Sequence, residues 1–224
     1  MPGRDIQLVN EEVYHVFNRG VSSQTIFNCD RDYFQFLDRI KYYQNGYLSI
    51  GYSQLNDLSL AVRGDLLTKL SEKKNFLVDI IAYCLMPNHF HLILKQKIEN
   101  GISKYLSNLT NSYTRYYNIK HKRVGPILQG KFKAIKVEND EQLLHLSRYL
   151  HLNPYSAGIV ENLKELFKYP YSSLIEYYNH HKGICQTDII LEQFQNSSSY
   201  KKFVLDQADF QRNLQIIKKQ ILES

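Results

Sequence analysis

The stretch Tyr83-Cys-Leu-Met-Pro-Asn-His-Phe-His-Leu-Ile-Leu-Lys95 decides the fold of this chain. An apolar run from Val78 to Met86 leads into a turn at Pro87-Asn88, and alternation follows from His89 to Leu94. Alternation with a period of two places successive side chains on opposite faces of a half-buried strand. Two strands separated by two turn residues predict an antiparallel hairpin.

The second strand of this hairpin carries two histidines on one face. We expect Phe90, Leu92 and Leu94 to form the core face, which leaves His89 and His91 together on the other. Two imidazoles at this spacing reach a single metal ion, and imidazole suits Zn, Fe, Ni, Cu and, with oxygen ligands added, Mn or Mg. On these residues alone, two half-exposed histidines without a metal are the commoner outcome.

Length and composition limit the class of protein. The 224 residues suit one domain with additions, and a hydrophobic content of 43% excludes a disordered chain. No apolar run is long enough to span a membrane, and the N-terminus lacks the apolar core of a signal peptide. Three widely spaced cysteines predict free thiols in a reducing cytoplasm.

The charge and the aromatic content both favour a polyanionic partner. The net charge is +6, although a solvated basic surface is the simpler explanation of that value. The chain has 18 Tyr and no Trp. Tyrosine rings can stack on unpaired bases, but most of them are expected to be ordinary packing residues.

Periodicity along the chain predicts an α+β fold. Strands are expected over 11–21, 78–86, 89–96 and 131–137, and helices over 31–44, 101–118 and 141–153. The segment 45–77 permits one amphipathic helix, and short helices follow residue 165. This order predicts a ferredoxin-like (RRM-like) antiparallel sheet with helices on one face, plus a helical C-terminal extension.

The helix predicted over 141–153 carries a second polar group. Asn139 or Asp140 is expected to cap its start, and Pro154 is expected to end it. Tyr149 and Asn153 lie one turn apart beside the leucine core stripe, so both could face the open side of the sheet. Alternatively, Tyr149 packs and Asn153 caps the helix end, and spacing alone does not separate these readings.

Four motifs in the same order resemble a known family, the single-tyrosine HUH transposases of the REP-associated tyrosine transposase group. Met86-Pro-Asn-His-Phe-His-Leu-Ile-Leu94 is similar to the His-hydrophobic-His signature, and Arg148-Tyr-Leu-His-Leu-Asn-Pro154 with Ala157-Gly158 resembles the tyrosine helix. Tyr14-His-Val-Phe-Asn-Arg-Gly20 resembles the N-terminal strand, and Gln129-Gly-Lys-Phe-Lys133 resembles the strand before the tyrosine helix. The resemblance runs from about residue 11 to residue 160.

The resemblance implies a metal-dependent enzyme that nicks and rejoins single-stranded DNA next to a hairpin. Tyr149 would be the nucleophile, forming a 5′-phosphotyrosine, and His89, His91 and Asn153 would bind the metal. Free tyrosine has a pKa near 10, so it needs activation at neutral pH. A divalent ion, Mg or Mn in use, can polarise the scissile phosphate.

The resemblance also sets expectations for DNA contacts and for the rest of the chain. Residues 1–164 would form the transposase domain, with an insertion at 45–77, and 165–224 a helical extension that could contact the DNA hairpin. The protein is expected in the cytoplasm of a bacterium or archaeon, at the nucleoid, as a monomer or homodimer. The candidate DNA-binding residues are basic: Arg19, Lys120, Lys122, Arg123, Lys131, Lys133 and Arg148.

Four alternatives remain open. Tyr113, Tyr116 and Tyr117 compete as nucleophiles, and His151 competes as a ligand, although it points to another side of the helix from Tyr149. A catalytically idle hairpin-binding protein would share the fold and the basic surface. A His-x-His metallohydrolase would need further ligands, for which the remaining histidines show no suitable spacing.

Overall fold

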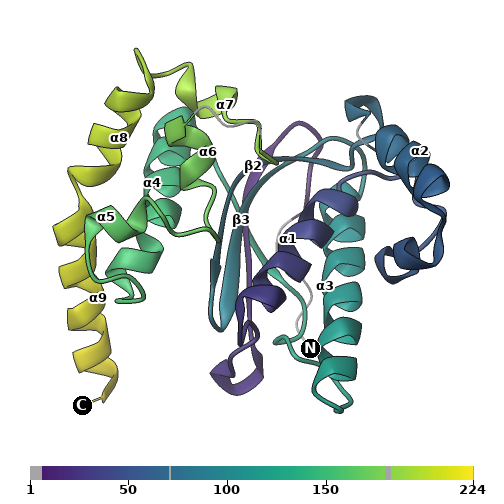
Figure 1. Ribbon diagram of the computed structural model, residues 1–224. Coiled ribbons are helices and arrows are strands. Elements are labelled where there is room, and N and C mark those ends of the chain that lie inside the picture. The colour runs from purple at the N-terminus through teal and green to yellow at the C-terminus, as the bar shows by residue number, and fades with distance from the viewer. Residues whose placement is uncertain (1–6, 71, 180–182, 224) are drawn as a thin grey trace. The chain divides into compact units, whose positions relative to one another are not determined.

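The computed structural model describes residues 7–70, 72–179 and 183–223 (Figure 1). Its four-stranded sheet has the order β2-β3-β1-β4. The strands are β1 (Val13–Arg19), β2 (Val78–Met86), β3 (His89–Gln96) and β4 (Lys133–Lys136). Helix α1 (Asp30–Tyr42) follows β1, and α3 (Gly101–Lys120) follows β3. The antiparallel α+β fold of ferredoxin-like order predicted from the sequence is therefore confirmed.

By its contacts the chain divides into two units. The first unit comprises Met1–Asp79, Pro87–His89 and Leu94–Lys136, and the second comprises Ile80–Met86, Phe90–Ile93 and Val137–Ser224. The division passes through β3, so His89 belongs to the first unit and His91 to the second. A transposase domain over 1–164 with an extension over 165–224 stays a prediction.

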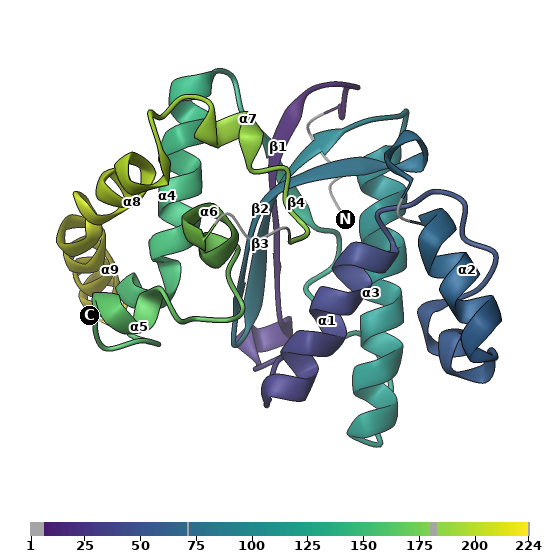
Figure 2. The ribbon, with the colours of Figure 1, turned by 45° about the horizontal axis from the view of Figure 1, so that its top comes forward.

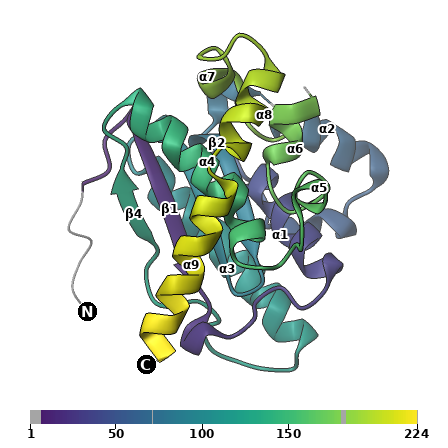
Figure 3. The same ribbon diagram turned by 90° about the vertical axis from the view of Figure 1, so that its left-hand side faces the viewer.

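In the first unit, β1 pairs antiparallel with β4 (Figure 3). Tyr14 lies opposite Lys136, and Phe17 lies opposite Lys133. Strand β1 alternates as the sequence predicts, because its even-numbered side chains are buried and most of the others are only partly covered. The lysines of β4 lie outside the core, which suits a strand at the edge of the sheet.

Helices α1 and α3 lie side by side in the first unit (Figure 1 and Figure 2). Their interface is aromatic, because Tyr113 of α3 meets Phe36 of α1 edge-on at 4.9 Å between ring centroids. Phe27 closes the cluster at 5.2 Å from Phe36. Such edge-to-face pairs stabilise a core beyond their buried area.

The segment 45–77 contains α2 (Leu60–Leu70), flanked by short 3-10 turns at Tyr52–Asp57 and Lys73–Asn75; a further 3-10 turn, Val21–Ser23, follows β1. The amphipathic helix is present where the sequence predicts one, but its apolar side chains are largely uncovered. Leu60 is 88% exposed and Val62 is 53% exposed, while Leu70 is buried at the end of the helix. Helical spacing of apolar residues therefore did not predict burial here, since burial also requires a packing partner.

The second unit consists mainly of helices, namely α4 (Asp140–Ser156), α5 (Leu163–Leu166), α6 (Leu174–Asn179), α7 (Asp188–Leu191), α8 (Ser197–Leu205) and α9 (Ala208–Glu223). Helix α4 packs against α9 and α8 (Figure 3). The short helices predicted after residue 165 are thus present. Across the described residues, no helix is both long and apolar enough to cross a membrane.

Helix α4 begins as predicted but ends later. Asn139 is the N-cap, and its side chain accepts a hydrogen bond from the Gln142 amide at 2.8 Å. The prediction that Pro154 ends the helix is wrong, because the helix continues to Ser156 with Pro154 inside it. The end is instead set by Gly158, whose φ of +73° closes a Schellman turn through its amide and that of the next residue.

Strand β3 also differs from expectation on one face. Leu92 and Leu94 form the predicted core face, and both are fully buried. The opposite face is not open, because His91 is only 8% exposed and Ile93 is fully buried. The ring of Tyr149 from α4 lies against His91 on this face. Alternation within the strand could not predict this contact, because Tyr149 belongs to a helix distant in sequence.

Candidate nucleophile and metal ligands

In the second unit, Tyr149 of α4 meets His91 of β3. Their ring centroids lie 6.1 Å apart, and the rings are nearly perpendicular at 84°. Burial, followed by the nearby Cys84 thiol, raises the pKa of Tyr149 above its usual value of 10. The hydroxyl is therefore protonated at neutral pH, and any reaction at Tyr149 requires a group that takes its proton or stabilises its anion.

Asn153 lies one turn beyond Tyr149 on α4. Its side chain is 4% exposed, and its Nδ2 atom has no hydrogen-bond partner among the described residues. An unpaired buried polar group costs about 1–3 kcal/mol, so its presence calls for a partner outside the protein. The reading of Asn153 as a helix-end cap is wrong, because α4 continues past it to Ser156.

His89 lies at the start of β3 in the first unit. Its Nδ1 atom is 2.6 Å from Oδ1 of Asn88. Burial, with a smaller effect of the Arg19 charge, lowers the pKa of His89 to about 4. A neutral imidazole at pH 7 keeps a lone pair, which metal binding requires.

The donor chemistry of these residues fits a divalent metal ion. Two imidazoles and one amide oxygen leave coordination positions for water and phosphate oxygens, which Mg or Mn needs. The described residues contain no group of three or more His, Cys, Asp or Glu side chains that could hold a metal ion. The expected set would not form such a group, because its third ligand is Asn153. The unpaired atom of Asn153 is the Nδ2 donor, which cannot bind a metal ion, so a ligand role for Asn153 would use its Oδ1 atom and stays a prediction.

His151 forms hydrogen bonds within the second unit. It is fully buried, and its two ring nitrogens lie 2.7 Å from the Tyr200 hydroxyl and 2.9 Å from the Ser173 hydroxyl. Burial lowers the pKa of His151 to about 3, so the ring is neutral. Both nitrogens have protein partners, which disfavours His151 as a substitute ligand.

The three competing tyrosines all have protein partners within the first unit. Tyr113 donates to the carbonyl of Ile26, and burial raises its pKa. Tyr116 donates to Asp32 at 2.8 Å; burial and then this bond raise its pKa to about 12. The Tyr117 hydroxyl lies within bonding distance of Asn28 and Thr25, so these three hydroxyls are poorly placed to act as nucleophiles.

The basic candidates for DNA contact fall into two groups. One group already makes contacts within the protein: Lys120 pairs with Asp32 at 2.6 Å, and Arg123 donates to Gln24 at 3.0 Å. Arg148 stacks on Phe203, with its guanidinium carbon 4.2 Å from the ring centroid. The other group is exposed, and it consists of Arg19, Lys122, Lys131 and Lys133. DNA binding by either group stays a prediction.

One positioning contact was not foreseen from the sequence. Gln211 of α9 donates to the backbone carbonyl of Tyr149 at 3.1 Å and to the Ser156 hydroxyl at 3.2 Å. A glutamine in a polar tail helix carries no motif, so only the folded chain reveals it. The C-terminal helix thus holds the backbone of the candidate nucleophile.

Comparison with known proteins agrees with the motifs. Residues 55–153, a little under half of the chain, match the family described as IS200-like transposase. This confirms the resemblance to single-tyrosine transposases. The matched segment contains His89, His91, Tyr149 and Asn153.

A solved structure gives the same fold. It is a REP-associated tyrosine transposase bound to a REP hairpin, with a TM-score of 0.56 and 14% sequence identity. The alignment covers 84% of this chain and 90% of that one. At this identity the likeness to the REP-associated transposase shows the fold alone. No curated protein matches the chain.

Proposed function

We propose that this protein is a metal-dependent single-strand DNA transposase of the HUH type, which cleaves and rejoins DNA next to a hairpin. Tyr149 is the nucleophile, and His89, His91 and Asn153 hold a divalent ion, Mg or Mn. The family match over 55–153 supports the reaction class. The solved transposase of the same fold is bound to a REP hairpin, which supports a hairpin DNA partner.

The contact between His91 and Tyr149 carries this proposal. A tyrosine nucleophile must lie beside the ion that stabilises the charge developing on the phosphate. In the second unit the Tyr149 ring is against a histidine of the predicted ligand set, and Asn153 is one turn away with an unpaired buried amide.

The reaction is a transesterification that conserves the phosphodiester bond energy. The Tyr149 oxygen forms a bond to phosphorus, the bond from phosphorus to the 3′ oxygen breaks, the phenolic proton passes to water, and the leaving 3′ oxygen takes up a proton from water. The products are a 5′-phosphotyrosine and a free 3′-hydroxyl, so rejoining needs no ATP. The bound divalent ion supplies Lewis-acid polarisation of the phosphate. The half-buried position of Tyr149 limits its freedom and excludes part of the competing water.

The remaining proposals follow from the same reaction. The exposed basic residues Arg19, Lys122, Lys131 and Lys133 contact phosphates, while Lys120, Arg123 and Arg148 contribute charge from fixed positions. The helices after residue 165 support the tyrosine helix and contact the hairpin. We propose that the protein works in the cytoplasm, at the nucleoid, as a monomer or homodimer.

A covalent-trapping assay tests the reaction. Labelled hairpin oligonucleotides taken from the DNA flanking the gene are incubated with protein and Mg or Mn, then denatured. We expect a covalent adduct from the wild type, and a loss of at least 100-fold in Tyr149→Phe and with a chelator. Tyr155→Phe is a matched control on the same helix and is expected to keep the adduct.

The outcomes separate the two candidate functions. An adduct that survives Tyr149→Phe shifts the nucleophile elsewhere. Hairpin binding without an adduct under any metal supports the second candidate, an idle repeat-hairpin binding protein on the same fold. A small-substrate hydrolase without a protein–DNA adduct would overturn both.

A further inference from the structure

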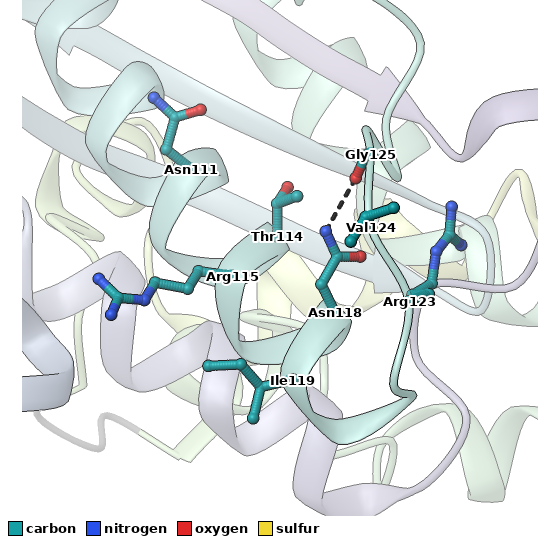
Figure 4. A pocket seen from close by; sticks show the side chains of 8 residues that line it. All are labelled: Asn111, Thr114, Arg115, Asn118, Ile119, Arg123, Val124 and Gly125. Carbon is teal, nitrogen blue, oxygen red and sulfur yellow. Dashed lines mark hydrogen bonds between the residues drawn. The ribbon is translucent and has the colours of Figure 1, made fainter.

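An open pocket lies at the C-terminal half of α3 in the first unit, on residues that the metal and nucleophile proposals do not use. Its volume is about 630 Å³. One wall is the outer face of α3, and the other is the loop that follows the helix (Figure 4). Its lining residues are Asn111, Thr114, Arg115, Asn118, Ile119, Arg123, Val124 and Gly125.

The lining combines apolar and polar groups that match the parts of a nucleotide. Ile119 is 70% exposed and Val124 is 91% exposed, so two aliphatic surfaces stand open to solvent beside the pocket. Arg115 is an exposed cation on the same helix. Aliphatic surface suits the face of a base, and a guanidinium suits a phosphate.

Asn118 adds a hydrogen-bond requirement. Its Nδ2 atom donates to the carbonyl of Gly125 at 2.8 Å, across the space between helix and loop (Figure 4). This bond fixes the orientation of the amide, since the reverse orientation would place two acceptors together. Its Oδ1 atom is buried and has no partner in the part of the chain that the structure describes.

The unpaired Oδ1 atom of Asn118 distinguishes a base from a phosphate. A buried acceptor without a donor is unfavourable, and a ligand that donates an N–H group relieves that cost. Nucleobases carry amino and imino donors, whereas a phosphodiester carries none at neutral pH. Gly125 in the loop has a φ of +92°, a backbone conformation that residues with a side chain rarely adopt.

We infer that this pocket binds one unpaired nucleotide of single-stranded DNA, with its base against Ile119 and Val124 and its phosphate at Arg115. The inference rests on the proposed function for its ligand class, because a DNA-nicking enzyme must hold unpaired DNA next to a hairpin. It adds a recognition site outside the residues assigned to catalysis. Arg123 supports the loop wall, because its guanidinium donates to Gln24 and to the carbonyl of Pro126.

Fluorescence anisotropy with the full chain tests the pocket. The probes are a labelled single-stranded 12-mer of mixed sequence and the same strand with abasic sugars, both measured in a chelator so that no cleavage occurs. The variants are Ile119→Ser and Arg115→Ala, which change exposed side chains and leave the core intact. Lys104→Ala is the matched control, because it removes one exposed positive charge from the first turns of the same helix.

Each variant has a distinct expected result. Ile119→Ser weakens binding of the natural strand about fivefold and leaves the abasic strand unchanged, since only a base contacts that side chain. Arg115→Ala weakens both strands about fivefold, because both have phosphates. Lys104→Ala changes either by less than twofold.

Failure of the pocket is distinguishable from failure of the proposed function. If Ile119→Ser binds the natural strand like the wild type, or if the wild type binds no single-stranded DNA, the pocket is rejected. If the adduct depends on Tyr149 but the pocket variants bind DNA like the wild type, the pocket is rejected and the proposed function is retained. Base-dependent binding at Ile119 with no adduct under any metal rejects the proposed function and keeps the pocket.

Discussion

At the scale of single residues, the polar groups of this protein divide into those with protein partners and those without. Asp32 belongs to the first kind, because it accepts hydrogen bonds from Lys120, Tyr116 and the backbone amide of Asn28 while its side chain is fully buried. Among the described residues, the Nδ2 atom of Asn153 belongs to the second kind. The first kind stabilises the fold, and the second is where we expect ligands to bind.

The Asp32 carboxylate is expected to make the fold sensitive to acid. Burial alone would raise its pKa, but the bonds from Lys120, Asn28 and Tyr116 together lower it below the ordinary 3.8. A depressed pKa gives stability that is present above the unfolded value and lost as pH falls below 3.8 through the folded value. Asp32→Asn should therefore lower the free energy of unfolding by about 2 kcal/mol at pH 7 and by much less near pH 2.5.

Urea unfolding at the two pH values measures this difference. Asp30→Asn is the control, because Asp30 lies in the same first turn but is exposed, and it should cost less than about 0.5 kcal/mol. A difference between wild type and Asp32→Asn that is the same at both pH values would contradict the assignment.

Asn153 is expected to affect metal affinity directly. If the proposed ligand set is correct, Asn153→Ala should weaken Mn²⁺ binding by about tenfold or more, because it removes one of the three proposed protein ligands. Asn162→Ala is a control, since Asn162 caps α5 and is not a predicted ligand. Calorimetric titration with Mn²⁺ measures both, and an unchanged affinity in Asn153→Ala would remove Asn153 from the ligand set.

At the scale of elements, local patterns predicted which elements exist, and packing decided where they end and which faces are covered. The hairpin of β2 and β3 followed from alternation around Pro87-Asn88, and the cap of α4 followed from Asn139. The exposed face of α2 and the covered second face of β3 could not be predicted, because both depend on partners distant in sequence. The end of α4 was missed because Pro154 removes one helical hydrogen bond, the one to the carbonyl four residues earlier, and the helix nevertheless continues past it to Ser156.

The candidate site shows the same division. His89, His91, Tyr149 and Asn153 were predicted from motifs; the structure shows the contact between His91 and Tyr149, and the catalytic roles stay a prediction. The sequence did not predict three contacts: His151 with Tyr200, Arg148 with Phe203, and Gln211 with the Tyr149 carbonyl. These are tertiary contacts between α4 and the C-terminal helices, and no local pattern encodes them.

Substitutions of two glycines test the C-terminal turn of α4 and the interior of α2. Gly158 has a φ of +73° and open space around its Cβ position, so Gly158→Ala should destabilise the protein by about 1 kcal/mol through the backbone alone. Gly64 lies inside α2, also with open space, and Gly64→Ala should stabilise it by about 0.5–1 kcal/mol. Thermal unfolding compares them, and a stabilising Gly158→Ala would contradict the Schellman end.

At the scale of the whole molecule, charge is the property most relevant to the proposed partner. The net charge of +6 arises from 28 basic and 22 acidic side chains. Several bases, including Lys95 and Lys97 with Glu11, are paired within the fold. The exposed cations that remain on the described surface are the ones expected to displace counterions from DNA.

Binding of single-stranded DNA should therefore depend steeply on salt. If four phosphates are neutralised, the affinity should fall roughly 50-fold between 50 and 200 mM salt, since each contributes about −0.7 to the logarithmic slope. Lys131→Ala with Lys133→Ala should reduce the slope by about 1.4, and Lys41→Ala with Lys164→Ala should leave it nearly unchanged. Equal slopes in both pairs would remove β4 and the turn before it from the DNA-binding surface.

The bond from Gln211 to the Tyr149 carbonyl also has a consequence for synthesis of the protein on the ribosome. Chains emerge from the N-terminus, and domains generally fold in that order. Helix α9 follows α4 in the chain by about 50 residues, so α4 lacks the support of α9 until that helix has also been synthesised. A message truncated before Ala208 would yield a polypeptide that has His89, His91 and Tyr149 but lacks the contacts of α9 with α4. We expect proteases to cleave α4 more readily in that polypeptide.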